Sequence, residues 1–213
     1  MIRLITFEGG DGTGKTTQIK AAENYLREHN QACVATREPG GTELGKLIRK
    51  VLLEVGDDEI APLTELFLYL ADRAQHVSQV IRPAVDAGKI VLCDRFTDST
   101  LVYQGYGRGI EHDWLRRLND IASEGLRPDI TLLFDCPAAV GLARTLRRQA
   151  QAAADRPPED RFEREEIEFH EKVRNGFLEL ARAEPGRFRI VDATRSITDV
   201  ARQVREIIDR ELA

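Results

Sequence analysis

The sequence shows no excess of positive charge. Lysine and arginine together number 31, aspartate and glutamate number 36, and the formal net charge is -5 at pH 7. Proteins that bind nucleic-acid polymers carry a strongly basic face, so this balance argues against such a partner. Any positive charge used in function must therefore be concentrated locally.

Cysteine is scarce, and long apolar runs are missing. Cys33, Cys93 and Cys136 have no metal-ligand spacing, and each lies within or just after a short apolar run, which is typical of small buried side chains. The sequence contains no cleavable leader and no stretch of about 18 apolar residues. We therefore expect a cytoplasmic protein that neither spans a membrane nor is exported.

What the sequence does contain is an alternation of short apolar runs and longer helical patterns. The apolar runs predict strands at residues 2–7, 32–36, 90–93, 130–134 and 188–191. Helical patterns cover residues 15–29, 43–53, 62–87, 113–123, 138–153, 164–183 and 197–212. Mostly continuous apolar strands, each followed by a helix, indicate an α/β sandwich whose parallel sheet is covered on both faces. Without a linker or repeat, the 213 residues predict a single domain with a charged, mobile excursion at about 149–166.

The most specific motif follows the first predicted strand. The segment starting at Gly9 and ending in Gly14-Lys15-Thr16 matches G-x-x-x-x-G-K-[ST], the phosphate-binding loop, or P-loop. Glycines let several backbone N–H groups point into one concavity, and the following helix adds partial positive charge at its N-terminus. Lys15 would reach the β- and γ-phosphates, and the Thr16 hydroxyl would hold Mg²⁺. We expect the whole loop to bind a nucleoside triphosphate through Gly9, Gly10, Asp11, Gly12, Thr13, Gly14, Lys15, Thr16 and Thr17.

The loop alone does not identify the reaction, because several classes of protein share it. GTPases usually carry an Asn-Lys-x-Asp motif, and no Asn-Lys pair occurs in this sequence. The third predicted strand ends in Asp94-Arg95, where the acid can orient a metal shell. The guanidinium beside it can bind a second phosphate, the one that receives the transferred group. Asp135 is the alternative metal-orienting acid, and it lacks such a basic neighbour in the sequence.

Six segments, in their order and spacing, resemble bacterial thymidylate kinases over nearly the whole chain: FEGGDGTGKTT, TREPGGT, LADRAQH, DRFTDSTLVYQGYGRG, RPD and DRFE. The resemblance implies the P-loop NTPase fold, with a five-stranded parallel sheet in the order 2-3-1-4-5 between two layers of helices, and a short lid. It also implies ATP-dependent phosphorylation of dTMP to dTDP, with Mg²⁺, by a homodimer.

The predicted helix 62–87 carries candidates for base recognition. Its core stripe comprises residues 63, 66, 67, 70, 74, 77 and 81, and Tyr69 and Arg73 fall beside it. Because they are four residues apart, a ring and a guanidinium can address one flat base together. In similar enzymes the residue at the position of Tyr69, usually Phe, stacks on thymine, and Arg73 hydrogen-bonds a thymine carbonyl.

The resemblance assigns further residues to the acceptor nucleotide. We expect 98–109 to be a loop that clamps base and sugar, in which Thr100 and Gln104 meet the pyrimidine edge. Tyr103 would crowd the place of a 2′-hydroxyl, and Ser99 belongs to the same segment. The monophosphate site of relatives also includes Glu38, Pro39 and Arg49, and the Glu38-Pro39 bond can be cis. The acid at the position of Asp11 contacts the acceptor's 3′-hydroxyl and a phosphate-binding arginine.

Phosphoryl transfer needs more positive charge than Lys15, Arg95 and Mg²⁺ provide. P-loop positions 10–13 hold no arginine, so the missing cation must come from elsewhere, and the excursion supplies the candidates Arg156, Arg161 and Arg164. Residues 160–163 match the DR-x-E pattern of bacterial lids, and we predict that Arg161 closes over the bound substrates. On resemblance alone, Arg144 stacks near adenine.

Catalysis is then predicted to rest on positioning and charge neutralisation by Lys15, Arg95, Arg161 and Asp11, because a phosphate monoester is already an ionised nucleophile.

Two alternative functions stay open. The chain could phosphorylate another monophosphate, such as dUMP, CMP or AMP, or it could be a nucleotide-binding regulator that has lost catalysis. For dimerisation, the hydrophobic flank of helix 62–87 could form either an interface or part of the core.

Overall fold

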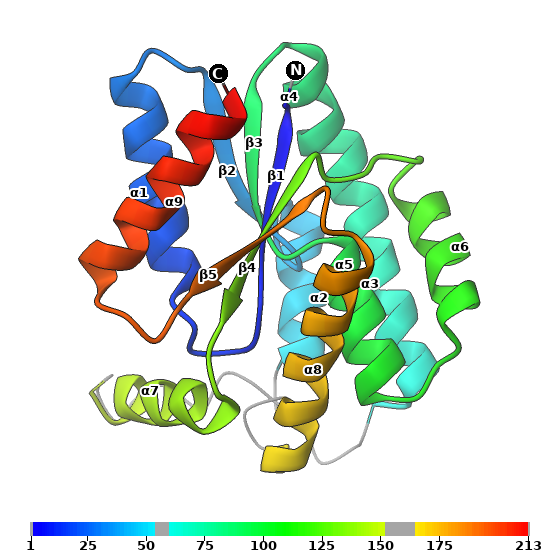
Figure 1. Ribbon diagram of the computed structural model, residues 1–213. Coiled ribbons are helices and arrows are strands. Elements are labelled where there is room, and N and C mark those ends of the chain that lie inside the picture. Colours follow the sequence, from blue (N-terminus) through cyan, green and yellow to red (C-terminus); the bar gives the residue numbers. More distant parts are fainter. Residues whose placement is uncertain (1, 54–59, 152–164, 213) are drawn as a thin grey trace.

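The computed structural model describes residues 2–53, 60–151 and 165–212, which form one parallel sheet with helices on both faces (Figure 1). The strands are β1 (Leu4–Glu8), β2 (Cys33–Arg37), β3 (Ile90–Asp94), β4 (Ile130–Asp135) and β5 (Phe188–Asp192). Their order is β2-β3-β1-β4-β5, and every neighbouring pair is parallel. The predicted sandwich and strand order are confirmed, with strand ends shifted by one or two residues.

The central strand β1 is buried along its whole length, as its continuous apolar sequence requires. Ile5 and Phe7 pack on one face of the sheet, and Leu4 packs on the other. In the register between β1 and β3, Phe7 is paired with Asp94. Because parallel strands end at the same edge of a sheet, the segments that follow β1 and β3 begin side by side.

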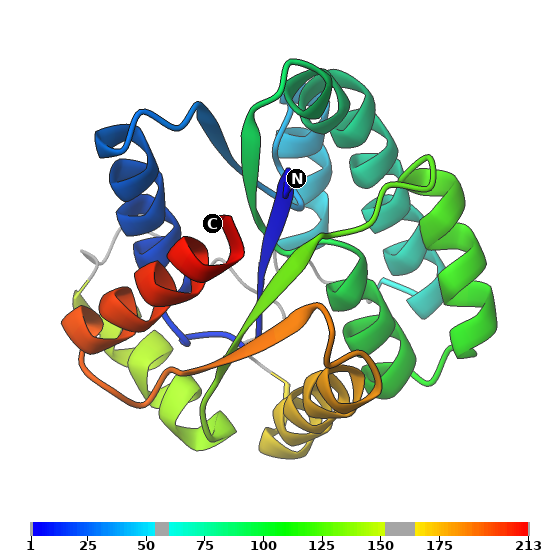
Figure 2. The ribbon, with the colours of Figure 1, turned by 45° about the horizontal axis from the view of Figure 1, so that its top comes forward.

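Two helices cover one face, and most of the others cover the opposite face (Figures 1 and 2). The first layer consists of α1 (Lys15–Glu28) and α9 (Ile197–Leu212). The second contains α2 (Glu43–Leu53), α3 (Pro62–His76), the π-helical segment η1 (Val77–Ile81), α4 (Arg82–Asp86), α6 (His112–Ala122) and α8 (Ile167–Ala183). After β3 come α5 (Thr97–Thr100) and the π-helical η2 (Leu101–Gly107), and α7 (Ala138–Gln151) follows β4.

The prediction of a loop over residues 98–109 is wrong, because α5 and η2 make this segment helical through Gly107. Its apolar residues are buried against α8, and Tyr103 packs near the rings of Phe169 and Phe177. A Cβ at Gly107 would lie 2.7 Å from the Phe169 ring. Gly107 thus permits close packing of two helical segments.

The predicted core stripe of α3 is only partly correct. Leu66 and Leu70 are buried, but Leu63 is 49% exposed and Phe67 is 56% exposed. Ala74 is also exposed. The buried face instead includes the polar residues Glu65, Asp72, Arg73 and His76. These side chains find hydrogen-bond partners next to the cavity described below, which allows the helix to turn them inward.

None of the described helices combines the length and the apolar content needed to cross a bilayer. The three cysteines are free thiols, and Cys93 and Cys136 are buried. Cys93 and Cys136 thus pack as small apolar side chains, as predicted, whereas Cys33 is only partly buried.

Candidate active site

The chain leaves β1 through the P-loop and enters α1 at Lys15. Gly14 caps this helix with a φ of 89°, a conformation that favours glycine. Lys15 Nζ donates hydrogen bonds to the carbonyl oxygens of Gly9 at 2.9 Å and Gly10 at 2.7 Å. Burial lowers the pKa of Lys15 to about 8, and the Arg95 guanidinium acts in the same direction. A concave backbone, a helix N-terminus and a buried ammonium group therefore meet where phosphate oxygens would bind.

The P-loop packs directly on α7. A Cβ at Gly141 of α7 would overlap the carbonyl oxygen of Asp11, and one at Gly12 would overlap the carbonyl oxygen of Gly141. Because neither backbone leaves room for a side chain at these two contacts, both positions require glycine. Gly141 thus shapes the loop, although it lies in a regular helix.

Two oxygen atoms suited to a divalent cation meet beside the loop. Thr16, in the first turn of α1, donates from Oγ1 to Oδ2 of Asp94, the last residue of β3, at 3.0 Å. A hydroxyl and one carboxylate fit Mg²⁺, because this ion keeps several waters and takes its other oxygens from phosphates. The two residues that the sequence assigned to a metal therefore lie together.

Arg95 reaches back from the end of β3 across the P-loop. Its φ of 67° is uncommon for a residue other than glycine. The guanidinium donates hydrogen bonds to the Gly9 carbonyl at 3.0 Å and to Asp11 Oδ1 at 2.6 Å. It also bonds Ser99 and lies 4.9 Å from the centre of the Tyr103 ring. Arg95 thus stands between the P-loop and the residues of α5 and η2.

Asp11 is a carboxylate inside the P-loop. Burial on its own would raise the pKa of Asp11, but Arg95 and then Lys15 outweigh that effect, and the pKa lies below its ordinary value. Asp11 Oδ2 also faces the hydroxyl of Tyr103 at 3.4 Å. The acid is therefore ionised, and it links the loop to Arg95.

Glu8, the last residue of β1, is a fully buried acid. It accepts hydrogen bonds from the backbone N–H of Phe96 at 2.8 Å and from the Ser99 hydroxyl at 2.6 Å. Burial raises the pKa of Glu8 to about 7; the Asp98 carboxylate acts in the same direction, and Arg95 opposes it. These hydrogen bonds hold the backbone in place directly after Arg95.

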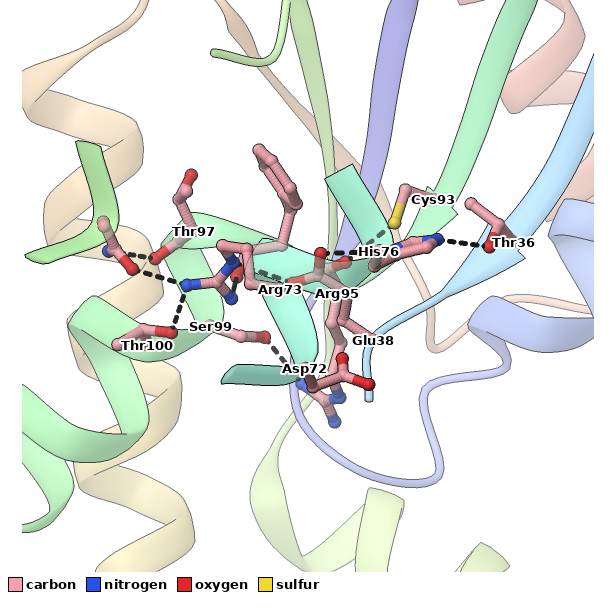
Figure 3. A network of polar contacts seen from close by, with 12 residues as sticks. Thr36, Glu38, Asp72, Arg73, His76, Cys93, Arg95, Thr97, Ser99 and Thr100 are labelled. Atoms are coloured by element: carbon pink, nitrogen blue, oxygen red, sulfur yellow. Dashed lines mark hydrogen bonds and ion pairs between the residues drawn. The ribbon is translucent and has the colours of Figure 1, made fainter. Parts of the chain in front are cut away.

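A second polar network connects α3 to the ends of β2 and β3 (Figure 3). Arg73 donates from Nε to Glu38 at 2.8 Å and from Nη1 to Thr100 at 2.8 Å. The same guanidinium bonds Asn119 of α6, and His76 bonds the other carboxylate oxygen of Glu38. Because every one of these side chains is buried, the network holds α3, α5 and α6 in fixed relative positions.

Many of the side chains described above line one cavity of about 230 Å³. The predicted site residues that line it are Asp11, Gly12, Thr13, Gly14, Lys15, Thr16, Thr17, Glu38, Pro39, Arg49, Tyr69, Arg73, Asp94, Arg95, Ser99, Thr100, Tyr103 and Gln104. The Glu38-Pro39 peptide bond is cis.

Four predicted residues do not belong to that lining as the structure describes it. Gly9 and Gly10, at the start of the P-loop, line a smaller cavity instead. Arg144 donates to the carbonyls of Ala193 and Thr194 instead. Arg161, together with Arg156 and Arg164, lies outside the described residues.

Sequence reasoning missed several residues that build this cavity. Those that line it are Arg37, Leu53, Phe96 and Arg148, and those that support it from behind are Glu8, Glu65, His76 and Asn119. An acid in an otherwise apolar strand could have identified Glu8, because a buried carboxyl group needs partners. Asn119 gives no such signal, since one amide in an amphipathic helix normally faces solvent.

Asp135, the alternative metal-orienting acid, does have a basic neighbour in space, contrary to the expectation from sequence. Arg174 of α8 donates from Nε to Asp135 Oδ1 at 2.8 Å and from Nη2 to Oδ2 at 3.1 Å. One guanidinium therefore engages both oxygens of Asp135, whereas Asp94 faces the hydroxyl of Thr16. Of the two acids, Asp94 is the better placed to hold a metal.

Comparison with known proteins gives one consistent result. The profile of the family described as "Thymidylate kinase" matches residues 7–204. A thymidylate kinase of Geobacter sulfurreducens is 52% identical over 96% of this chain and 95% of the relative. One from Nitratidesulfovibrio vulgaris is 50% identical over 96% and 97%. The crystal structure of thymidylate kinase from Ehrlichia chaffeensis superposes with a TM-score of 0.75 at 35% identity, covering 97% of this chain and 98% of that one.

Proposed function

The chain belongs to the thymidylate kinase family, and as such an enzyme it phosphorylates dTMP; we propose that ATP is the phosphoryl donor, that Mg²⁺ is required and that dTDP is the product. One observation carries this proposal. Arg95 bonds both the P-loop carbonyl of Gly9 and the carboxylate of Asp11. It therefore lies between a loop that suits the phosphates of ATP and the part of the cavity lined by α3, α5 and η2.

The donor phosphates would bind the P-loop amides, with Lys15 at the β- and γ-phosphates. Thr16 and Asp94 would hold Mg²⁺, which when bound neutralises charge between the β- and γ-phosphates. Arg95 would bind the phosphate of dTMP, with Asp11 orienting the guanidinium. No general base is needed, so these residues act by holding the reacting oxygens in line and balancing their charge.

The acceptor base would lie at the other end of the cavity. Tyr69 offers a ring for stacking, and Arg73, Thr100 and Gln104 offer polar groups for the pyrimidine edge. Tyr103, whose hydroxyl faces Asp11, would lie against the sugar and exclude a 2′-hydroxyl. Glu38, Pro39, Arg49 and Ser99 complete the monophosphate site in this proposal.

The remaining expectations stay predictions. We propose a single kinase domain with a lid at about 149–166 that delivers Arg161, and a role for Arg144 near adenine. We also propose a homodimer that forms through α2 and α3, because both helices expose apolar side chains: Leu44, Leu47, Val51, Leu63 and Phe67. Location in the cytoplasm is likewise predicted.

A panel of nucleoside monophosphates tests the substrate assignment. With ATP and Mg²⁺, dTMP should give the fastest ADP release, with slower turnover of dUMP and little of CMP or AMP. Lys15→Ala should lower kcat by about 10²- to 10³-fold, because a cation at the transferred group is lost. Lys20→Ala, at an exposed position of the same helix, should leave kcat unchanged. Rapid turnover of CMP without dTMP activity would contradict the proposal, and nucleotide binding without any turnover would favour a regulator.

A further inference from the structure

Glu65 is a fully buried acid in the first turn of α3, and none of the catalytic steps above uses it. Its Oε1 accepts a hydrogen bond from Nε2 of Gln104 at 2.8 Å. Arg108 approaches both carboxylate oxygens at 3.4 Å, and also pairs with Glu165 at 2.7 Å. A guanidinium carries donors only, so both Glu65 oxygens act as acceptors toward Arg108. Glu65 therefore presents acceptors only to its neighbours.

This acceptor decides which way the Gln104 amide is turned. An amide has a donor end and an acceptor end, and only the NH₂ end can face a carboxylate. With Nε2 bound to Glu65, the carbonyl oxygen Oε1 is directed away from it, and Gln104 lines the large cavity. Among the described residues, no hydrogen bond reaches Gln104 Oε1. The side chain thus offers the cavity an acceptor whose orientation is fixed from behind.

The donor and acceptor pattern of the base gives this orientation a consequence. Thymine and uracil carry a donor at N3 between two carbonyl groups, whereas cytosine carries an acceptor at N3 beside an amino group. A fixed acceptor at Gln104 would pair with N3–H of thymine but would face the N3 lone pair of cytosine. Arg73 and Thr100, which share this end of the cavity, are joined at 2.8 Å and suit a carbonyl of the base.

We propose that Glu65 is a specificity-determining positioning residue, which holds the Gln104 amide in the orientation that selects a pyrimidine with a donor at N3. The inference rests on the proposed binding of dTMP in this cavity. Without Glu65 the amide could turn over and present its NH₂ group to cytosine. Selection of this kind works through repulsion of the wrong base as well as attraction of the right one.

Glu65→Gln tests the inference, because glutamine keeps the size of the side chain but offers either an oxygen or an NH₂ group to Gln104. The measured quantities are kcat/KM for dTMP and the inhibition constant of dCMP against dTMP. We expect the preference for dTMP over dCMP to fall by roughly tenfold or more, through weaker dTMP and tighter dCMP binding. The KM for ATP and kcat at saturating dTMP should stay within about twofold. Glu43→Gln, at an exposed acid of α2, should leave the preference unchanged.

Glu65→Met provides a second test that does not depend on how the introduced amide pairs. Its side chain is apolar and of similar length, so Gln104 again loses the group that fixes it, and the preference should fall in the same way. General damage to the fold would lower activity with dTMP without tightening dCMP binding. An unchanged preference in the folded variants would overturn the role of Glu65 and leave the proposed function intact. A wild-type enzyme that turns over dCMP but not dTMP would instead overturn the proposed function.

Discussion

Single residues set the chemistry of the cavity, and their burial makes part of that chemistry depend on pH. Glu8 is the clearest case, since its carboxyl group is fully buried and its pKa is raised to about 7. As pH rises from the ordinary pKa of a glutamate toward 7, the unfolded chain releases this proton before the folded chain does. The contribution of Glu8 to the free energy of unfolding is therefore complete in acid and is lost as pH rises through that window.

Glu8→Gln should remove this dependence, because glutamine stays neutral and can still accept from the N–H groups of Phe96 and Ser99. Relative to the wild type, the variant should gain unfolding free energy between pH 5 and pH 8, by up to roughly 3 kcal/mol. Urea unfolding of both proteins at pH 5, 6.5 and 8 measures the difference. Parallel pH profiles for the two proteins would show that Glu8 does not titrate in this window.

The site residues that were predictable from sequence are those whose proposed role is to contact a phosphate or a metal. Lys15, Thr16 and Arg95 have fixed spacing from a strand end, because the sheet edge brings strand ends together. Glu8 and Glu65 were not predicted, because each forms hydrogen bonds with other groups of the protein instead of with a ligand. No spacing along the chain records which amide or backbone N–H an isolated buried acid will contact.

At the scale of secondary structure elements, the position of the P-loop depends on its contact with α7. Alanine is better than glycine in a helix by about 1 kcal/mol, so Gly141→Ala should stabilise α7 if nothing touched this position. Because a Cβ there would overlap the carbonyl oxygen of Asp11, we expect the opposite: lower thermal stability and a KM for ATP raised about tenfold.

The matched control for this change is Ala143→Gly, at an exposed position of the same helix. It should cost about 1 kcal/mol of unfolding free energy and leave the KM for ATP unchanged. Thermal unfolding and initial-rate measurements on both variants test the pair. A stable Gly141→Ala enzyme with normal ATP kinetics would show that the loop does not rely on this contact.

Elements were harder to predict where tertiary contacts override the local pattern. The sequence predicts a loop in the segment after β3, yet this segment is helical through Gly107 because its apolar residues pack against α6 and α8. In α3, hydrophobic periodicity selected Leu63 and Phe67 for the core. The buried network of Arg73 and His76 instead turns these two apolar residues outward.

For the whole molecule, the alternation of apolar runs and helices predicted the sandwich, and the resemblance to a family supplied the strand order. Local patterns alone do not specify which strands are neighbours, because β1 pairs with β3 and β4, which are distant in sequence. The pairing of Phe7 with Asp94 is the long-range fact on which the site depends.

The exposed apolar side chains of α2 and α3 predict the assembly of the whole molecule. Phe67→Glu would put a charge into the proposed interface and should separate the two chains. In sedimentation velocity, the wild type should have twice the chain mass, and the variant should have a mass near 24.0 kDa. Ile197→Glu, at an exposed position of α9 on the other face of the sheet, should remain a dimer. A monomeric wild type, or a Phe67→Glu variant that stays dimeric, would contradict this assignment of the interface.

Direct transfer between two nucleotides held end to end is the central claim, and ATP labelled at its γ-phosphate measures it. With dTMP and Mg²⁺ present, the label should appear in dTDP, with one ADP formed for each dTDP and little inorganic phosphate released. Release of the label as inorganic phosphate, at a rate that does not depend on dTMP, would contradict the account.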